Sequence, residues 1–305
     1  MDARITKQRL ANMLTYDWLK ILGTIALAAV VFCVFFMMIA TRATVGQTYY
    51  IYVYSGLTVG GDFNGLKDDL KNKSVFSYDI LDLGSESFNN SGVYGSTAFS
   101  ARRSAGEGRV MFVSDDRTTD ENGKEFSTLL SFIDNEGTSA ESFALFLDPQ
   151  VFLNDCEKYL QKFFGENLSG ELNREQARST FMERNGKDKR FRSAAKKEAG
   201  VKQEEARLEK LKKDFLTVRE AVDTESLGFV KYTGFGEKEH VIGFSMESLH
   251  LTKLVYYTEK DEDREVVTNS KIALCIFNNK EREGDLKYET VNFLAYLLEK
   301  YGAVE

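Results

Sequence analysis

The sequence predicts an α/β protein: a single N-terminal transmembrane helix followed by a mixed, largely parallel sheet with helices on both faces and an inserted helical hairpin. Three observations predict this. Residues 21–40 contain no charged side chain, strand-like and helix-like patterns alternate through residues 47–114, and residues 171–222 are charge-dense with almost no strand-like run. The alternation of strand-like and helix-like patterns is typical of parallel βαβ units, in which a helix connects one strand to the next.

The apolar stretch from Ile21 to Ala40 reads ILGTIALAAVVFCVFFMMIA. A helix of that length rises about 30 Å, the thickness of the hydrocarbon core of a bilayer. Basic residues are concentrated before it, at Arg4, Lys7, Arg9 and Lys20, whereas Arg42 lies close behind it. The positive-inside rule therefore predicts a cytoplasmic segment 1–20, a membrane-spanning segment 21–42 in the lipid bilayer, and an extracytoplasmic remainder.

A cleaved signal peptide is the alternative reading of this stretch. Signal peptides have a shorter apolar core, of roughly 7 to 15 residues, followed by a small-x-small cleavage site. Arg42 stands inside the would-be cleavage region, so we expect a retained anchor in the cell membrane.

Composition narrows the function classes. The chain has 305 residues and a net charge of −7, and residues 1–40 carry four basic and two acidic side chains, which leaves about −9 on the rest. Nucleic acid is therefore not an expected partner. Of the three cysteines, Cys33 lies in the apolar stretch; Cys156 and Cys275 either pair or stay as buried thiols, and we expect buried thiols.

Residues 43–170 read as the first part of an α/β domain. Residues 47–55, QTYYIYVYS, suit a central strand buried on both faces. A short helix over 63–70, a strand over 76–83, a helix over 94–106 that ends at Gly106, and a strand over 109–114 follow. Two more strands are predicted over 126–133 and 142–147, and Pro149 begins a helix that continues to residue 164.

Residues 171–222 predict the inserted hairpin. Apolar residues recur every three or four positions from Val201 to Val222, with the single charged exception Glu204. This pattern indicates a long helix with one apolar seam, and a helix over 174–185 supplies the partner face. A single helix that packs on the sheet is the alternative.

Residues 223–305 complete the α/β domain. A β-hairpin is predicted from strands 227–233 and 240–244 around Gly234, Phe235 and Gly236. A helix over 249–254, an acidic solvated turn over 259–265, a buried strand over 272–277 and a closing helix over 286–301 follow.

Signatures of catalysis, metal binding and cofactor binding are weak. His240 and His250 have no second metal ligand at a recognised spacing, the chain has no G-x-S-x-G motif, and Gly60 to Lys67 lacks the lysine of a phosphate loop. We therefore expect no catalytic residue, no metal and no cofactor. A calcium site is the alternative interpretation of an acidic turn formed by Asp115, Asp116, Asp120 and Glu121.

Two segments resemble the extracellular solute-binding proteins of ABC importers. These are residues 101–113, ARRSAGEGRVMFV, and the tail in which strand 272–277 and Asn278 and Asn279 precede the helix VNFLAYLL. The resemblance implies a type 2 periplasmic-binding fold, with two α/β lobes around a ligand cleft. The overall plan also resembles single-pass surface proteins of Gram-positive bacteria. The helices of 171–222 have no counterpart in that family.

Two functions are therefore predicted. The first is a membrane-tethered module that presents or senses a small polar solute, alone or with a membrane transporter. Ligands of open α/β sheets bind beyond the carboxyl ends of the strands, which selects Tyr54, Ser55, Gly84, Ser85, Ser114 and Asp115. The second is an interaction protein of the cell envelope that docks a partner through the basic tip of the hairpin, whose residues are Arg184, Lys187, Lys189, Arg190 and Arg192.

Overall fold

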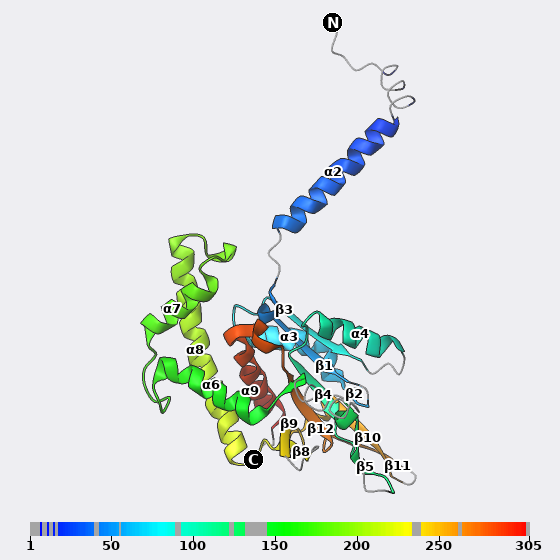
Figure 1. Ribbon diagram of the computed structural model, residues 1–305, viewed down its shortest axis with the longest axis vertical. Helices are drawn as coiled ribbons and strands as arrows, with labels where there is room; N and C mark the ends of the chain where they lie inside the picture. Colours follow the sequence, from blue (N-terminus) through cyan, green and yellow to red (C-terminus); the bar gives the residue numbers. More distant parts are fainter. Residues whose placement is uncertain are drawn as a thin grey trace. The chain divides into compact units, whose positions relative to one another are not determined.

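The computed structural model describes residues 7, 11, 15, 18–39, 43–54, 56–88, 93–121, 125–131, 145–233, 239–261 and 264–302. The chain divides into two compact units, Met1–Arg42 and Ala43–Glu305. The segments predicted as 43–170, 171–222 and 223–305 all belong to the second unit (Figure 1).

The first unit contains the helix α2 (Trp18–Ile39). Among the described residues, it is the one helix long and apolar enough to cross a membrane, and none of its apolar window is buried by other parts of the chain. The predicted apolar helix is thus confirmed. Residues 40–42, the end of the predicted span, lie outside the described part.

The main sheet of the second unit has the strand order β3-β1-β4-β12-β9-β8, and β7 pairs with β12. Its strands are β1 (Thr48–Val53), β3 (Asp82–Ser87), β4 (Val110–Ser114), β7 (Phe146–Leu147), β8 (Phe229–Thr233), β9 (Glu239–Ser245) and β12 (Ile272–Phe277). Only β1–β3 and β1–β4 are parallel, and the pairs made by β12 with β4, β7 and β9 and by β8 with β9 are antiparallel.

The predicted α/β class and mixed sheet are confirmed, but "largely parallel" is wrong. Crossover helices α3 (Gly61–Asn72) and α4 (Val93–Ser104) build the parallel half. The second half of the chain returns to the sheet without such crossovers: β8 and β9 form an antiparallel pair, and β12 then enters against β4. Strands that follow one another through a short connection, as β8 and β9 do, pair antiparallel. The chain reaches β12 only after η4, β10 and β11, and β12 then runs opposite to β4. The predicted turn of this hairpin, 234–236, lies outside the described residues.

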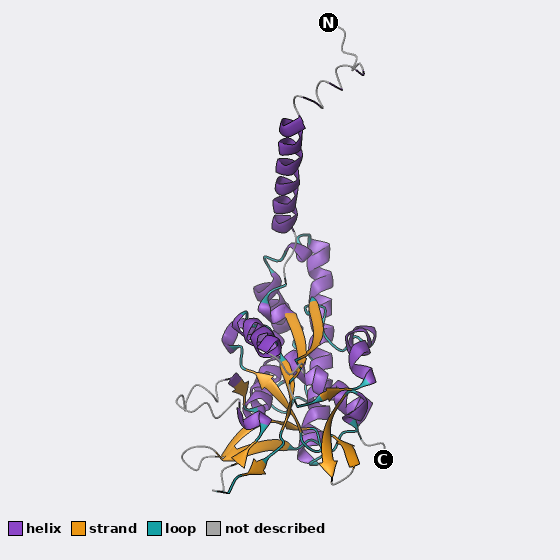
Figure 2. Cartoon of the chain, turned by 90° about the vertical axis from the view of Figure 1, so that its right-hand side faces the viewer, coloured by secondary structure: helices purple, strands orange, loops and turns teal. Residues whose placement is uncertain are grey.

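Helices cover both faces of the sheet (Figures 1 and 2). On one face Tyr49, Ile51 and Val53 of β1 share a core with α3, α6 (Pro149–Phe164), α8 (Ala194–Asp223) and α9 (Glu289–Tyr301). On the other face Tyr52 packs in a smaller core with α4 and α5 (Thr128–Ser131). Side chains of a strand alternate between faces, so β1 supplies both cores.

Smaller elements complete the unit. They are the sheet β11-β10-β2, made of β2 (Thr58–Val59), β10 (Val255–Asp261) and β11 (Arg264–Thr268); the pair β5 (Thr118–Thr119) and β6 (Glu125–Phe126); and the 3-10 turns η1 (Val45–Gln47), η3 (Lys189–Phe191), η4 (Leu251–Lys253) and η5 (Lys280–Tyr288). The predicted solvated turn 259–265 is therefore wrong over the residues that form β10 and β11, and the predicted helix 249–254 is only the short η4.

Two predicted strands are misplaced. The strand expected over 76–83 is β3, because Phe76 and Ile80 instead anchor a loop against the larger core. The strand expected over 126–133 holds β6 and then α5. Here Ser127 Oγ accepts the Leu130 N–H at 2.9 Å, which starts a helical turn. Residues 132 and 133 lie outside the described part.

The predicted helices 174–185 and 201–222 are found as α7 (Arg174–Asn185) and α8, and they pack on each other. Their antiparallel hairpin is not confirmed. In an antiparallel pair, later residues of one helix meet earlier residues of the other. Here Arg178 bonds Glu198, and Arg184, further along α7, bonds Glu204, further along α8.

Candidate functional site

The carboxyl end of β4 carries the candidate site. Ser114 ends the strand and pairs with Ile272, the first residue of β12. Beyond it the Asp115 N–H donates to the carbonyl oxygen of Lys271 at 2.7 Å. The start of one strand and the end of its antiparallel neighbour are thus held together, and this brings the side chains of Asp115 and Lys271 to the same end of the sheet.

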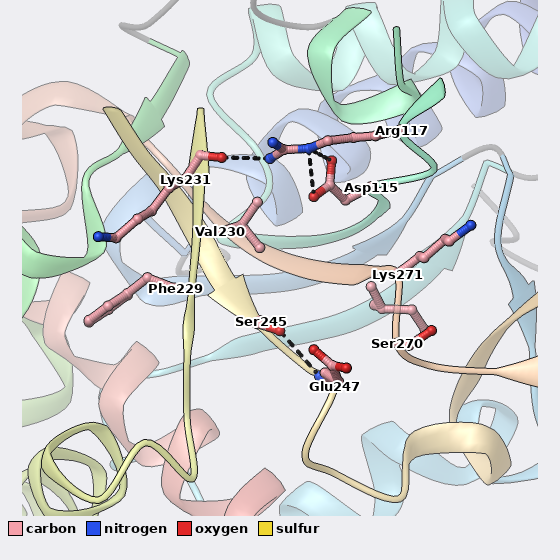
Figure 3. A pocket seen from close by; sticks show the side chains of 10 residues that line it. Asp115, Arg117, Phe229, Val230, Lys231, Ser245, Glu247, Ser270 and Lys271 are labelled. Atoms are coloured by element: carbon pink, nitrogen blue, oxygen red, sulfur yellow. Dashed lines mark hydrogen bonds and ion pairs between the residues drawn. The ribbon is translucent and has the colours of Figure 1, made fainter. Parts of the chain in front are cut away.

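A pocket of about 200 Å³ lies at this end of the sheet. Figure 3 shows the Asp115–Arg117 pair at one end of it and the Glu247 carboxylate at the other. Its wall comes from four segments of the chain and comprises Asp115, Arg117, Phe229, Val230, Lys231, Ser245, Glu247, Ser270, Lys271 and Ile272. Acidic, basic and hydroxyl groups therefore surround one small space.

The Arg117 guanidinium is fixed by its neighbours. Its Nε lies 2.9 and 3.2 Å from the two oxygens of Asp115, and its Nη2 donates to the Lys231 carbonyl oxygen at 2.6 Å (Figure 3). These bonds tie the loop after β4 to β8. Because a planar guanidinium presents its donors in a rigid fork, its orientation in the pocket is set before any solute arrives.

The two lysines of the wall also have acidic neighbours. Lys271 Nζ lies 2.5 Å from Glu259, and this hydrogen bond raises the pKa of Lys271 above its ordinary value. Lys231 Nζ lies 3.0 Å from Glu239. Lys271 consequently stays protonated at neutral pH and contributes a lasting positive charge at the rim of the pocket.

The predicted ligand residues after the first and third strands lie in different surroundings, and only one of them lines the pocket. Asp115 lines the pocket. Ser114 has no exposed surface. Tyr54 is half-buried, with its ring 5.3 Å from that of Phe99, and Ser55 lies outside the described residues.

Gly84 and Ser85 were predicted to follow the second strand, and this placement is wrong. Both lie inside β3, where Gly84 pairs with Tyr50 and Ser85 with Ile51. A Cβ at Gly84 would lie only 2.4 Å from the Tyr50 ring, so a larger residue would collide with that ring. The glycine that reads as a strand end is a packing requirement inside the strand.

Two residues of the predicted basic tip belong to a buried ionic cluster instead. Its guanidinium groups are those of Arg184, Arg190 and Arg207, and its carboxylates are those of Asp79, Asp188, Glu204, Asp285 and Glu289. Arg184 bonds Asp79, Glu204 and Asp285 at once. Lys187, Lys189 and Arg192, the other predicted tip residues, are exposed.

Arg207 lies at the centre of this cluster, with 1 % of its side chain exposed. Its Nε donates to Glu289 at 2.7 Å and its Nη1 to Glu204 at 2.9 Å. Burial would lower the pKa of Arg207, but the surrounding carboxylates raise it well above its ordinary value. Burial would raise the pKa of Asp285, yet Arg207 and Arg184 hold it below its ordinary value. Arg207 and Asp285 are therefore both charged at neutral pH.

Sequence reasoning missed most of the pocket wall. Arg117 stands two residues after Asp115, so a basic residue this close to a predicted site residue was an available signal. The sequence contains no such signal for Lys271, Ser270 and Glu247. These residues reach the pocket only through the antiparallel pairing of β12 with β4 and β9.

Within the described residues, no group of three or more His, Cys, Asp or Glu side chains could hold a metal ion. Cys156 and Cys275 are free and buried, and burial raises the pKa of both thiols. Comparisons of the chain with protein-family models, with curated proteins and with solved structures found no match.

Proposed function

We propose that this protein is a membrane-tethered, solute-binding-like module that holds a small polar solute in the pocket beside Asp115. The observation that carries the proposal is the gathering of Asp115, Arg117, Glu247 and Lys271 around one concavity at the carboxyl end of β4. Ligands of open α/β sheets bind outside the carboxyl ends of the strands. The module presents this solute to a membrane transporter or senses it.

The chemistry of the pocket favours a solute that carries both charges, such as a free amino acid. Arg117 and Lys271 suit a carboxylate, and Glu247 with Asp115 suits an ammonium group. The volume of about 200 Å³ is below the roughly 300–1,000 Å³ of drug-sized sites and suits a small molecule. Asp115, Arg117, Lys231 and Lys271 are each held in an ion pair, an arrangement that favours binding over catalysis.

We propose that residues 43–305 face the extracytoplasmic side, since the basic residues concentrate before α2. The topology is testable with a membrane-impermeant maleimide on intact cells, in a Cys33→Ser background that removes the exposed thiol of α2. Cys156 and Cys275 are buried, and Lys202 is exposed. A Lys202→Cys chain is labelled in intact cells if the proposal holds. Labelling that requires lysed cells would place the domain in the cytoplasm.

The test of the function is thermal unfolding of the full chain in detergent, followed by circular dichroism, with each proteinogenic amino acid added singly. A solute at a hundred times its Kd stabilises the folded state by about 2.7 kcal/mol. The stabilisation should fall to about 0.4–1.4 kcal/mol in Lys271→Met, because a 10- to 100-fold weaker site is only partly saturated. It should persist in Lys202→Met, which removes an exposed lysine of α8. No shift with any amino acid, or equal shifts in both variants, would contradict the proposal.

A docking protein of the cell envelope remains the second candidate, on one observation: Lys187, Lys189 and Arg192 are exposed close together in sequence around η3. An acidic partner would use these three and not Arg184 or Arg190, whose charges the buried cluster engages.

A further inference from the structure

The main sheet has an open edge at β3. In the strand order β3 comes first, and among the described residues it pairs only with β1. The Phe88 N–H donates to the Val53 carbonyl oxygen, which fixes which groups of β3 face β1. Because the backbone of a strand alternates, the N–H and C=O groups of Leu83, Ser85 and Ser87 point away from β1. Such a row is a template for another strand.

An apolar pocket adjoins this edge. It measures about 360 Å³ and is lined by Leu70, Lys71, Ser74, Phe76, Ser77, Tyr78, Ile80, Leu81 and Leu83. Leu83 belongs to both the edge and the pocket, and Leu81 is 41 % exposed. The hydroxyl of Ser77 is buried without a hydrogen-bond partner in the described structure. A strand laid about 4.8 Å from β3 would place a side chain beside Leu83, over this pocket.

The opposite face of the same edge is acidic. Asp82 and Glu86 point to the face of Tyr50, where Asp82 accepts from the Tyr50 hydroxyl at 2.8 Å and Glu86 lies 2.8 Å from Arg102. Glu107 also bonds Arg102, so Glu86 and Glu107 share one guanidinium, while Asp82 bonds the uncharged Tyr50 hydroxyl. This net negative charge complements lysine or arginine and opposes a second copy of β3, which would bring the same acids together.

We propose that β3 is a docking edge for an extended segment of a partner protein in which apolar residues alternate with lysine or arginine. The segment adds a strand to the sheet through the backbone of Leu83, Ser85 and Ser87. Its apolar side chains enter the pocket beside Leu81 and Leu83, and its basic side chains meet Asp82 and Glu86. This is strand addition to a sheet edge, where backbone bonds give affinity and side-chain pockets give specificity.

The probe is a fluorescent heptapeptide of alternating lysine and valine, and its binding to the full chain in detergent is followed by anisotropy. Ser85→Pro removes one outward N–H without touching the β1 ladder, a position where edge strands tolerate proline. It should weaken binding about tenfold or more, whereas Ser85→Thr, which keeps the N–H, should not. Leu81→Asp should also weaken binding, and Leu216→Asp, on an exposed leucine of α8, should not.

Several results would overturn the proposal. Equal binding of an alternating glutamate–valine peptide would show that Asp82 and Glu86 do not select a basic segment. Equal binding by Ser85→Pro and wild type would show that the peptide does not pair with the backbone of β3. No binding of the lysine–valine peptide to the wild type would reject it outright. A dimer in sedimentation that Ser85→Pro dissociates would show that β3 pairs with a second copy. If Ser85→Pro does not fold, Leu81→Asp against Leu216→Asp decides the question.

Discussion

The buried ionic cluster and the pocket beside Asp115 are built from the same residue types but differ in their access to water. Arg207, Glu204 and Glu289 in the cluster expose 1 % of the side chain or less. In the pocket, Arg117 exposes 32 % of its side chain and Lys271 exposes 40 %. We infer from burial that the cluster residues stabilise the fold, and that the pocket residues are accessible to a solute.

The two sites should therefore respond differently when one member of an ion pair is removed. In the cluster both carboxylate oxygens of Glu289 accept hydrogen bonds, one from Arg207 and the other from the Ser77 N–H and the Asn292 side chain. A buried charge without its partner cannot be solvated, so removal of one member costs more than the pair itself contributes. In the pocket, water replaces a missing partner. Substitution of a charged residue should thus lower the free energy of unfolding in the cluster, and weaken solute binding in the pocket.

The largest effect is expected from Arg207→Met. It leaves Glu204, Asp285 and Glu289 without their shared guanidinium, and we expect the free energy of unfolding to fall by about 3–5 kcal/mol. Chemical denaturation of the full chain in detergent measures this. The matched control, Arg219→Met, removes an arginine of the same helix whose side chain is 41 % exposed, and should cost about 0–1 kcal/mol. Equal losses in both variants would mean that burial does not separate them.

The next effect is expected from Arg184→Lys. An ammonium cannot reach Asp79, Glu204 and Asp285 together, so one buried carboxylate loses its partner at a cost of about 1–3 kcal/mol. Arg192→Lys, at an exposed position near the start of α8, should leave the unfolding midpoint unchanged. If Arg184→Lys left stability intact but weakened capture of an acidic partner, Arg184 would belong to a docking tip after all.

A smaller effect should appear in acid. The pKa of Asp285 is held below its ordinary value by Arg207 and Arg184 against the opposing effect of burial, so the folded state binds its proton less readily than the unfolded chain. This stabilisation is present above the unfolded pKa of about 3.9 and is lost as pH falls through the lower folded value. Asp285→Asn should flatten this acid limb of stability against pH. Asp155→Asn should not, because the Asp155 side chain is 44 % exposed and lies 3.8 Å from Lys158 in a surface ion pair.

The sequence contained a usable signal for the cluster. Apolar spacing predicted the seam of α8, and Glu204 was the one charged member of that seam; the structure buries it completely. A carboxylate inside an apolar stripe requires a buried cation. Which cation meets it could not be predicted, since Arg184 and Asp285 reach Glu204 and Arg207 only once α7 and η5 pack against α8.

The strands β1, β4, β8, β9 and β12 were predicted close to their observed bounds, because each is a run of apolar or alternating residues. Local pattern contains no information on pairing direction. The expectation of a largely parallel sheet therefore placed the site at the ends of three parallel strands and missed Lys271, which antiparallel β12 brings beside Asp115.

The smallest effect on stability, and the sharpest test of the comparison, is expected from Lys271→Met. Lys271 is partly exposed and its ion pair with Glu259 lies at the surface, so the free energy of unfolding should change by less than about 0.5 kcal/mol. A solute that uses this charge should nevertheless bind about 10- to 100-fold more weakly, because a hydrogen bond to a charged group is worth about 1.5–3 kcal/mol. Calorimetric titration with the best amino acid measures this. A large loss of stability would place Lys271 with Arg207, among the groups that hold the fold.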